Sequence, residues 1–266
     1  MSKVSNARAE LREMDELSAR TSPIHRFHPL TKLLVTLIYL FAVVSFSKYS
    51  FSALSVMLIY PVLTFQISGI PARLCFHKLR VMLVLVCAVG ILNPFFDRTP
   101  MLTIGGLTVT GGVISMATLM LKGVFALMAS FLLIATTSID RLCAALRKLH
   151  VPRILVTLLL LTYRYVSVML RQVSIMMDAY ALRAPGQKGV HISAWGSFLG
   201  QLLLRSIDRG SELYQSMEIR GFCGEFHYAR GGGYRAADLC YMLCWAAFFL
   251  VARLVDLPWL LGNLFV

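Results

Sequence analysis

The sequence predicts an all-α membrane protein with about five transmembrane helices and a cytoplasmic insert of long amphipathic helices between the fourth and the fifth. The chain of 266 residues is 58% hydrophobic with a mean hydropathy of +0.71, which is more apolar surface than one core needs. Apolar blocks of near-bilayer length alternate with basic segments, and the net charge is +13. Lipid is therefore the expected solvent for much of the chain.

Four apolar blocks come before residue 140 and a fifth follows residue 238. A helix needs about 20 apolar residues to span a bilayer, so the first and third blocks are short. They must borrow flanking residues such as Leu30 and Thr31, or let Lys32 and Lys48 extend their ammonium groups to the membrane surface. The blocks are 33–47, 49–72, 81–96, 101–139 and the stretch from 239 onward. The predicted organisation is a cytoplasmic segment 1–32, transmembrane helices one to four in 33–137, an insert 138–235 and transmembrane helix five in 236–266.

The basic residues separate the two sides of the membrane. Six precede the first block, three lie between the second and third, and thirteen lie between the fourth and fifth, which together make 22 of the 26 in the chain. Cytoplasmic loops carry the excess of Lys and Arg, so the N-terminus and residues 138–235 are predicted to be cytoplasmic in a multi-pass plasma membrane protein. Because apolar blocks divide these charges, no nucleic-acid partner is expected.

Two features of the apolar blocks stand apart from a plain helical pattern. Residues 101–110 contain two β-prone runs around a Gly-Gly pair and predict a small hairpin between the third and fourth helices. Lys122 interrupts the fourth block, and a cation inside a span suggests function by default. Two interpretations of Lys122 stay open: a substrate ligand, or a side chain that snorkels or pairs with a neighbouring subunit.

The insert predicts a short helix followed by two long ones. The short helix ends at Val151-Pro152, because the residue before a proline avoids helical backbone. Apolar residues recur at spacings of three and four over 155–180 and again over 199–217, so each stretch predicts a long amphipathic helix with a seam that packs on another helix. Helices of this size reach roughly 40 Å. Pro185-Gly186 stops the first long helix, and Gly221 caps the second.

Each long helix finishes in an arginine beside a small residue. An exposed arginine there offers a fork of donors to carboxylates or carbonyls, and a small neighbour lets a partner backbone approach. The simpler role is that each arginine complements the dipole of its own helix. Two such ends in one insert favour a pair of docking points on a two-fold symmetric partner. The predicted site residues are Leu182, Arg183, Ala184, Ile219, Arg220 and Gly221.

The sequence contains no recognisable catalytic, cofactor or metal motif. His25 and His28 flank the start of the first span, but with no third ligand nearby they favour interfacial anchoring over a metal pair. Cys240 and Cys244 lie one helical turn apart without a neighbouring His or carboxylate, so core packing is expected. No phosphate loop, carboxylate pair or Ser/His/Asp set is present, which predicts a protein that is not an enzyme.

Five short segments carry a family resemblance. They are 22–32 (Ser-Pro-Ile-His-Arg-Phe-His-Pro-Leu-Thr-Lys), 136–138 (Thr-Thr-Ser), Val151-Pro152, 163–166 (Tyr-Arg-Tyr-Val) and 217–222 (Met-Glu-Ile-Arg-Gly-Phe). Together they resemble the transmembrane T component of energy-coupling factor transporters, the CbiQ/EcfT family, over nearly the whole chain.

The resemblance implies a non-catalytic subunit of an ABC-type importer in a prokaryotic plasma membrane. Its expected partners are two ATP-binding-cassette ATPase subunits, a membrane substrate-binding subunit of the S or CbiM-like type, and lipid. In the family, two Ala-Arg-Gly-type motifs end the coupling helices and insert into grooves on the ATPases, which makes Arg183 and Arg220 the coupling arginines. Here Ala184 stands where the first motif has glycine. Residues 14–17 and the chain length are similar to cobalt-type members, so cobalt or nickel is the expected substrate.

Other functions stay open from the sequence. General T components for vitamin uptake share the same core motifs. A membrane enzyme acting on anionic lipid, with Arg164 and Arg171 as phosphate contacts, is a further alternative.

Overall fold

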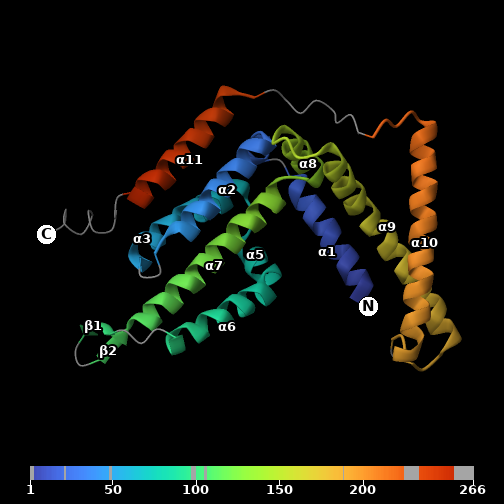
Figure 1. Ribbon diagram of the computed structural model, residues 1–266, viewed down its shortest axis with the longest axis horizontal. Helices are drawn as coiled ribbons and strands as arrows, with labels where there is room; N and C mark the ends of the chain where they lie inside the picture. The colour runs from blue at the N-terminus through green and yellow to red at the C-terminus, as the bar shows by residue number, and fades with distance from the viewer. Residues whose placement is uncertain are drawn as a thin grey trace. The chain divides into compact units, whose positions relative to one another are not determined.

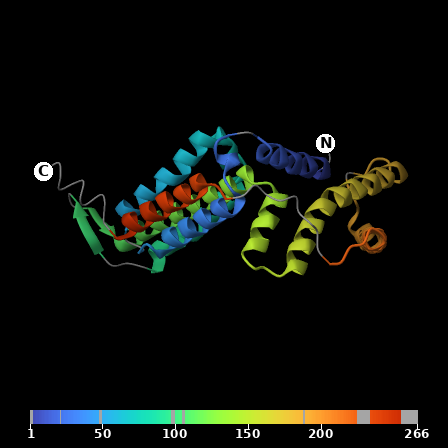
Figure 2. The same cartoon turned by 90° about the horizontal axis from the view of Figure 1, so that it is seen from above.

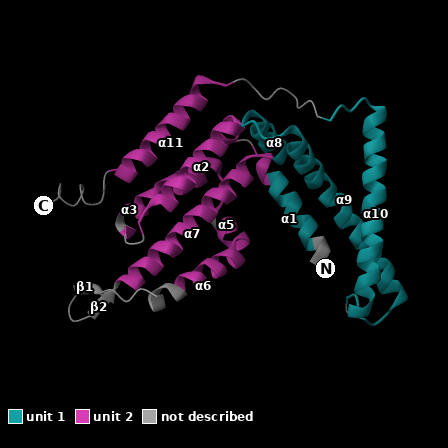
Figure 3. Ribbon diagram, viewed as in Figure 1, with its two compact units in different colours: residues 1–16, 139–231 teal, residues 17–138, 232–266 magenta. Residues whose placement is uncertain are grey.

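The computed structural model describes residues 3–20, 22–47, 50–96, 100–104, 107–187, 189–224 and 234–254. The chain divides into two compact units (Figure 3). Unit 1 comprises residues 1–16 and 139–231, and unit 2 comprises residues 17–138 and 232–266. Each unit is built almost entirely from helices (Figure 1), so the predicted fold class, an all-α membrane protein, is confirmed.

Unit 2 contains the apolar helices that correspond to the first four predicted spans and to the fifth. Its order along the chain is η1 (Ile24–Arg26), α2 (Pro29–Ser45), α3 (Phe51–Ser55), η2 (Val56–Leu58), α4 (Ile59–Ser68), α5 (Ala72–Lys78), α6 (Arg80–Phe96), β1 (Pro100–Ile104), β2 (Leu107–Thr110), α7 (Gly111–Thr136) and α11 (Ala236–Leu254). The second predicted block is thus divided among α3, η2 and α4. The last twelve residues, 255–266, lie outside the described residues.

The core of unit 2 lies between α2, α7 and α11, which run alongside one another in both views (Figures 1 and 2). Tyr39 of α2, Phe125 of α7 and Phe249 of α11 are fully buried and belong to one apolar cluster. Trp245 stacks on Phe249 with ring centroids 5.6 Å apart. Aromatic contacts of this kind add directional packing to the area that is buried.

The predicted hairpin is confirmed. Strands β1 and β2 pair antiparallel, with Thr103 opposite Thr108 and Ile104 opposite Leu107. The turn residues 105–106 lie outside the described residues. The hairpin leads directly into α7, which begins at Gly111.

Unit 1 contains most of α1 (Lys3–Ser18), then α8 (Ile139–Lys148), α9 (Arg153–Arg183) and α10 (Ile192–Ile219). Cys143 of α8 packs against Val156 and Leu160 of α9. His150 follows α8 with a φ of +62°, and its N–H donates to the oxygen of Arg147 at 3.1 Å. This left-handed residue closes α8 just before Val151-Pro152, as the sequence predicted.

The predicted packing of each seam on another helix is not seen among the described residues. Leu155 and Leu159 of α9 are 57% and 44% exposed, and α10 has no buried residue among those described. α9 instead buries Val156 and Leu160, on a neighbouring face, against α8. A periodic apolar stripe indicates that a face has to be covered, but it does not identify what covers it.

Three described helices are long and apolar enough to cross a membrane: α7, α9 and α11. Shorter apolar helices cover Pro29–Ser45, Ala53–Ser68 and Arg80–Ile91. α9 meets this criterion although its basic flanks predict that it belongs to a cytoplasmic insert. The placement of 138–235 on the cytoplasmic side therefore stays a prediction.

Candidate functional site

The first arginine end is built from the last turn of α9 and a tight turn after it. Arg183 is the last helical residue, and the neighbouring Leu182 is 84% exposed. Ala184 has a φ of −127°, and its N–H donates to the oxygen of Tyr180 at 3.0 Å. The left-handed conformation that alanine disfavours is supplied two residues later, by Gly186 with a φ of +96°.

The Tyr180 hydroxyl joins this turn to the start of α10 through hydrogen bonds with Gln187 and His191, which together form a side-chain brace. The N–H of Gln187 donates to the oxygen of Ala184 at 3.3 Å, which closes the turn. The Tyr180 hydroxyl donates to Oε1 of Gln187 at 3.0 Å and accepts the N–H of His191 at 3.4 Å. His191 in turn caps α10, because its Nδ1 accepts the N–H of Ser193. Arg183 is therefore held close to the first residues of α10.

The second arginine end closes α10 by backbone hydrogen bonds. The N–H of Gly221 donates to the oxygen of Glu218 at 2.9 Å, and the N–H of Phe222 donates to the oxygen of Met217 at 3.0 Å. Gly221 has a φ of +76°. These bonds make a Schellman motif, so the predicted role of Gly221 as a left-handed cap is confirmed. Arg220 is the C-cap residue and is exposed.

The two arginine ends lie at opposite ends of α10. The helix has 28 residues, which corresponds to about 42 Å at about 1.5 Å per residue. Leu182 and Ile219, one residue before each arginine, are 84% and 88% exposed. Each end therefore presents an apolar side chain beside a guanidinium group. This combination suits insertion into a partner groove whose rim carries carbonyl or carboxylate oxygens.

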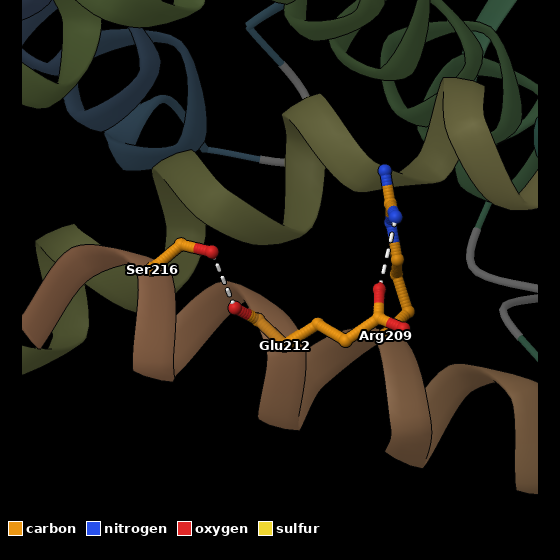
Figure 4. A network of polar contacts seen from close by, with 3 residues as sticks. All are labelled: Arg209, Glu212 and Ser216. Carbon is orange, nitrogen blue, oxygen red and sulfur yellow. Dashed lines mark hydrogen bonds and ion pairs between the residues drawn. The ribbon is translucent and has the colours of Figure 1, made fainter. Parts of the chain in front are cut away.

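The face of α10 between the two ends carries charged and polar side chains. Arg209 Nη1 donates to Oε2 of Glu212 at 3.0 Å, and Ser216 Oγ donates to the backbone oxygen of Glu212 at 2.7 Å (Figure 4). Both partners of the Arg209–Glu212 ion pair are more than half exposed, so it contributes little to stability.

The part of the chain that the structure describes offers no candidate metal site. No group of three His, Cys, Asp or Glu side chains there is arranged to hold a metal ion. A cavity of about 390 Å³ in unit 1 is lined by Arg8, Ala9, Arg12, Glu13, Glu16 and Ser174. Its two arginines are balanced by two glutamates.

The histidines and cysteines singled out in the sequence differ in their surroundings: His25 and His28 are buried, whereas Cys240 and Cys244 are exposed. His25 and His28 are both buried, so neither is an interfacial anchor. His25 Nδ1 lies 2.7 Å from the Ser22 hydroxyl, and His28 Nδ1 accepts the N–H of Leu30 as the N-cap of α2. Cys240 and Cys244 are exposed instead of packed in the core. Core packing was therefore the wrong expectation for both.

Comparison with known proteins decides the family. The family model of the cobalt transport protein CbiQ matches residues 20–228 of this chain. The chain belongs to the CbiQ family. The CbiQ match runs from before α2 to beyond α10, so it includes both arginine ends.

Curated relatives of this CbiQ-family chain include transport proteins. The energy-coupling factor transporter transmembrane protein EcfT of Leuconostoc gelidum subsp. gasicomitatum is 26% identical over 220 residues, which is 75% of this chain and 79% of EcfT. The nickel permease LarQ of Lactiplantibacillus plantarum is 34% identical over 100 residues, which is 38% of this chain and 36% of LarQ. The predicted membership of the CbiQ/EcfT family is confirmed.

A further relative of this CbiQ-family chain is the uncharacterized protein MJ1571 of Methanocaldococcus jannaschii, which is 28% identical over 111 residues, 41% of this chain. The chain spans 38% of the length of MJ1571 and 36% of LarQ, less than two fifths of each.

Proposed function

We propose that this chain is the transmembrane coupling subunit of an energy-coupling factor importer. It transmits the movement of two ATPase subunits to a membrane subunit that binds the substrate, and it performs no catalysis itself. The single observation that carries the proposal is the pair of exposed arginine ends, one before the start and one at the end of α10, a helix of 28 residues and about 42 Å. Two separate docking points match a motor made of two similar subunits.

In this proposal Arg183 and Arg220 each enter a groove on one ATPase subunit. The guanidinium groups bind carbonyl or carboxylate oxygens in the groove, while Leu182 and Ile219 contact its apolar wall. Gly221 leaves room for the backbone of the second ATPase. At the first end, Ala184 occupies the position that glycine has at the second end. The tight turn at Gly186 then directs the chain away from the partner surface.

The mechanism is mechanical. When ATP binds, the two ATPase subunits draw together and displace both arginine ends. α9 and α10 carry that displacement toward the membrane, and the transmembrane helices tilt the substrate-binding subunit. Long helices suit this task, because each of their backbone hydrogen bonds resists bending.

We place the N-terminus and residues 138–235 on the cytoplasmic side of a prokaryotic plasma membrane. The distribution of basic residues supports this side, with thirteen of them between the fourth and fifth predicted spans. The middle of α9 also binds acidic groups of two polar helices: Tyr163 Oη donates to Asp15 of α1, and Arg164 pairs with Asp140 of α8 at 3.1 Å. A helix with such partners is better placed beside the bilayer than across it.

We propose cobalt, or the related cation nickel, as the transported substrate. The family description and the name of LarQ support a transition-metal cargo. EcfT, whose name gives no substrate, aligns over more of this chain. The alternative is therefore a T component shared by several vitamin-binding subunits, which has the same core motifs. Uptake of radioactive cobalt by cells that express the chain with its substrate-binding and ATPase subunits distinguishes the two.

The coupling role is tested by reversing both arginine charges. In Arg183→Glu/Arg220→Glu, we expect the purified chain to lose stoichiometric binding of the ATPase subunits. The matched control is Arg209→Glu, which reverses a charge in the middle of α10 and should retain binding. Full ATPase binding by the double variant would refute the proposal.

A further inference from the structure

The C-terminal end of α2 receives a lysine from α7. Nζ of Lys122 donates to the backbone oxygen of Val44 at 3.1 Å and to that of Phe46 at 2.5 Å. α2 ends at Ser45. These oxygens therefore lie at the C-terminal end of the helix, where backbone carbonyl groups have no N–H partner within the helix. Lys122 thus caps α2 and complements the negative end of its dipole. The sequence left open a substrate ligand, or a side chain that snorkels or pairs with a neighbouring subunit, whereas the contacts in the structure are to the end of α2.

The opposite ends of the same two helices show the reverse arrangement. Nζ of Lys32, in the first turn of α2, donates to the oxygen of Thr136 at 2.8 Å and to Oγ1 of Thr137 at 3.4 Å. Thr136 is the last residue of α7. Lys32 is only 5% exposed, so the alternative in which it extends to the membrane surface is wrong, and Lys48 lies outside the described residues. α2 and α7 therefore run antiparallel, and each caps the C-terminal end of the other with a lysine.

α11 is tied to the same two ends of α2. Asp238, 3% exposed, accepts the N–H of His28 at 2.8 Å through Oδ1 and the N–H of Arg235 at 3.0 Å through Oδ2. The second bond caps the start of α11, in the manner of a capping box. At the other end, Arg253 donates to the backbone oxygen of Ser45 at 3.1 Å and to its hydroxyl at 3.2 Å.

Apolar packing fills the space between these polar ends. Tyr39 in the middle of α2 lies 5.3 Å from Phe249 of α11, measured between ring centroids. Tyr39 shares its cluster with Phe125 and Ala129 of α7, and all four residues are buried. Both ends and the middle of α2 are thus fixed to the two neighbouring helices.

We propose that α2, α7 and α11 form one rigid body throughout the transport cycle, and that Lys32 and Lys122 are positioning residues that keep α2 and α7 in register. This inference rests on the proposed function, because it concerns the part of the subunit that stays fixed while substrate moves. The rest of the subunit then moves around this three-helix body.

The physical reason is the cost of separating these groups in an apolar environment. A sliding step between α2 and α7 would remove an ammonium donor from backbone oxygens at both ends at once. Carbonyls and cations that lose their partners away from water are strongly unfavourable. A two-ended arrangement therefore resists translation along the helix axes more than apolar packing does.

A cross-link between α2 and α7 tests the rigid body directly. Ser47→Cys, just after α2, and Leu119→Cys, one turn from Lys122 on α7, flank the Lys122 end of the pair. A bifunctional thiol reagent of about 8–10 Å matches the usual distance between packed helix axes. The background lacks the six native cysteines, and the complex contains the ATPase and substrate-binding subunits.

We expect the cross-linked complex to transport at the rate of the untreated complex. Loss of transport on cross-linking, with both single-cysteine variants unaffected by the reagent, would overturn the rigid body. Absence of transport before any cross-linking would instead count against the proposed function, so the two failures are distinguishable.

Substitution of Lys122 tests its positioning role. In Lys122→Met we expect transport to fall by about tenfold, since two backbone oxygens lose their donor, and the yield of the Ser47–Leu119 cross-link to fall with it. Lys122→Arg should restore both, because arginine keeps a charged donor of similar reach. An unchanged cross-link yield in Lys122→Met would contradict the role. The cross-link in the protein with native Lys122 decides the rigid body even if Lys122→Met does not fold.

Discussion

Tyr180 and His191 are joined across the turn between α9 and α10, where the backbone N–H of His191 donates to the Tyr180 hydroxyl at 3.4 Å. The same hydroxyl donates to Gln187 at 3.0 Å. The end that carries Arg183 therefore depends on a side-chain brace. The end that carries Arg220 is closed by backbone hydrogen bonds. The two ends should respond differently to substitution.

Tyr180→Phe should weaken ATPase binding at the first arginine end. The variant loses two hydrogen bonds of a surface turn, which corresponds to about threefold to tenfold in affinity. Binding is measured in the Arg220→Glu background, so that it depends on the first end alone. Tyr214→Phe, which removes an exposed hydroxyl near the opposite end of α10 from Tyr180, is the matched control. Equal affinity in the two variants would show that the brace does not position Arg183.

Gly221→Ala should destabilise the end of α10. An alanine with a φ of +76° costs about 1–2 kcal/mol. Gly210→Ala is the opposite case, because Gly210 lies inside the helix with open space around it, and alanine there should stabilise by up to about 1 kcal/mol. Thermal unfolding in detergent, followed by circular dichroism at a helix wavelength, gives the two shifts. Shifts of the same sign would contradict the assignment of Gly221 as the cap.

Gly123→Ala should disturb the packing of α6 on α7. A Cβ at this position would lie 2.4 Å from Cγ1 of Val86, closer than two carbon atoms can approach. We expect a loss of about 1–3 kcal/mol, as for other overpacked sites. The double variant Gly123→Ala/Val86→Ala should recover part of it, because the smaller side chain makes room. Without such recovery in thermal unfolding, the contact with Val86 would not be the cause.

Cys143 and Cys223 should differ in their reaction with maleimide. Burial raises the pKa of the Cys143 thiol, Asp140 raises it further, and Arg164 partly opposes this. Since the thiolate is the reactive form, Cys143 should react slowly at neutral pH and faster as the pH rises. Cys223 is exposed and should react first. Mass spectrometry of a variant that retains only these two cysteines measures both rates, and faster labelling of Cys143 would refute its burial.

The same variant tests the proposed topology. A membrane-impermeant maleimide should leave Cys223 unlabelled in intact cells and label it in inverted membrane vesicles. Added ATPase subunits should then slow the labelling, because Cys223 lies three residues after Arg220. Labelling in intact cells would place residues 138–235 outside and would remove the basis for ATPase docking.

The long helices could be predicted because apolar residues recur along them at spacings of three and four. The break at Pro185-Gly186 and the cap at Gly221 follow from backbone rules that act over a few residues, and both are confirmed. The hairpin at 100–110 follows from equally local signals. α1 was not predicted, because its polar sequence has no apolar periodicity to indicate a helix.

Contacts between distant segments were not predictable in the same way. Lys32 and Lys122 look like isolated charges in a sequence, and only the antiparallel pairing of α2 with α7 brings each to the end of the other helix. Asp238 likewise meets His28 from 210 residues away. The partner of the apolar stripe that contains Leu155 could not be predicted for a related reason, since such a stripe does not specify what covers it.

The length of α10 sets the distance between the two ends that carry Arg183 and Arg220. Because the helix itself sets their separation, inserting seven residues would lengthen the span by about 10 Å while turning Arg220 by only about 20°. Inserting two residues would add about 3 Å but swing Arg220 about 160° away from its original direction. In the proposed coupling role, the number of residues in α10, and not only their identity, therefore sets which pair of docking grooves the subunit can occupy simultaneously.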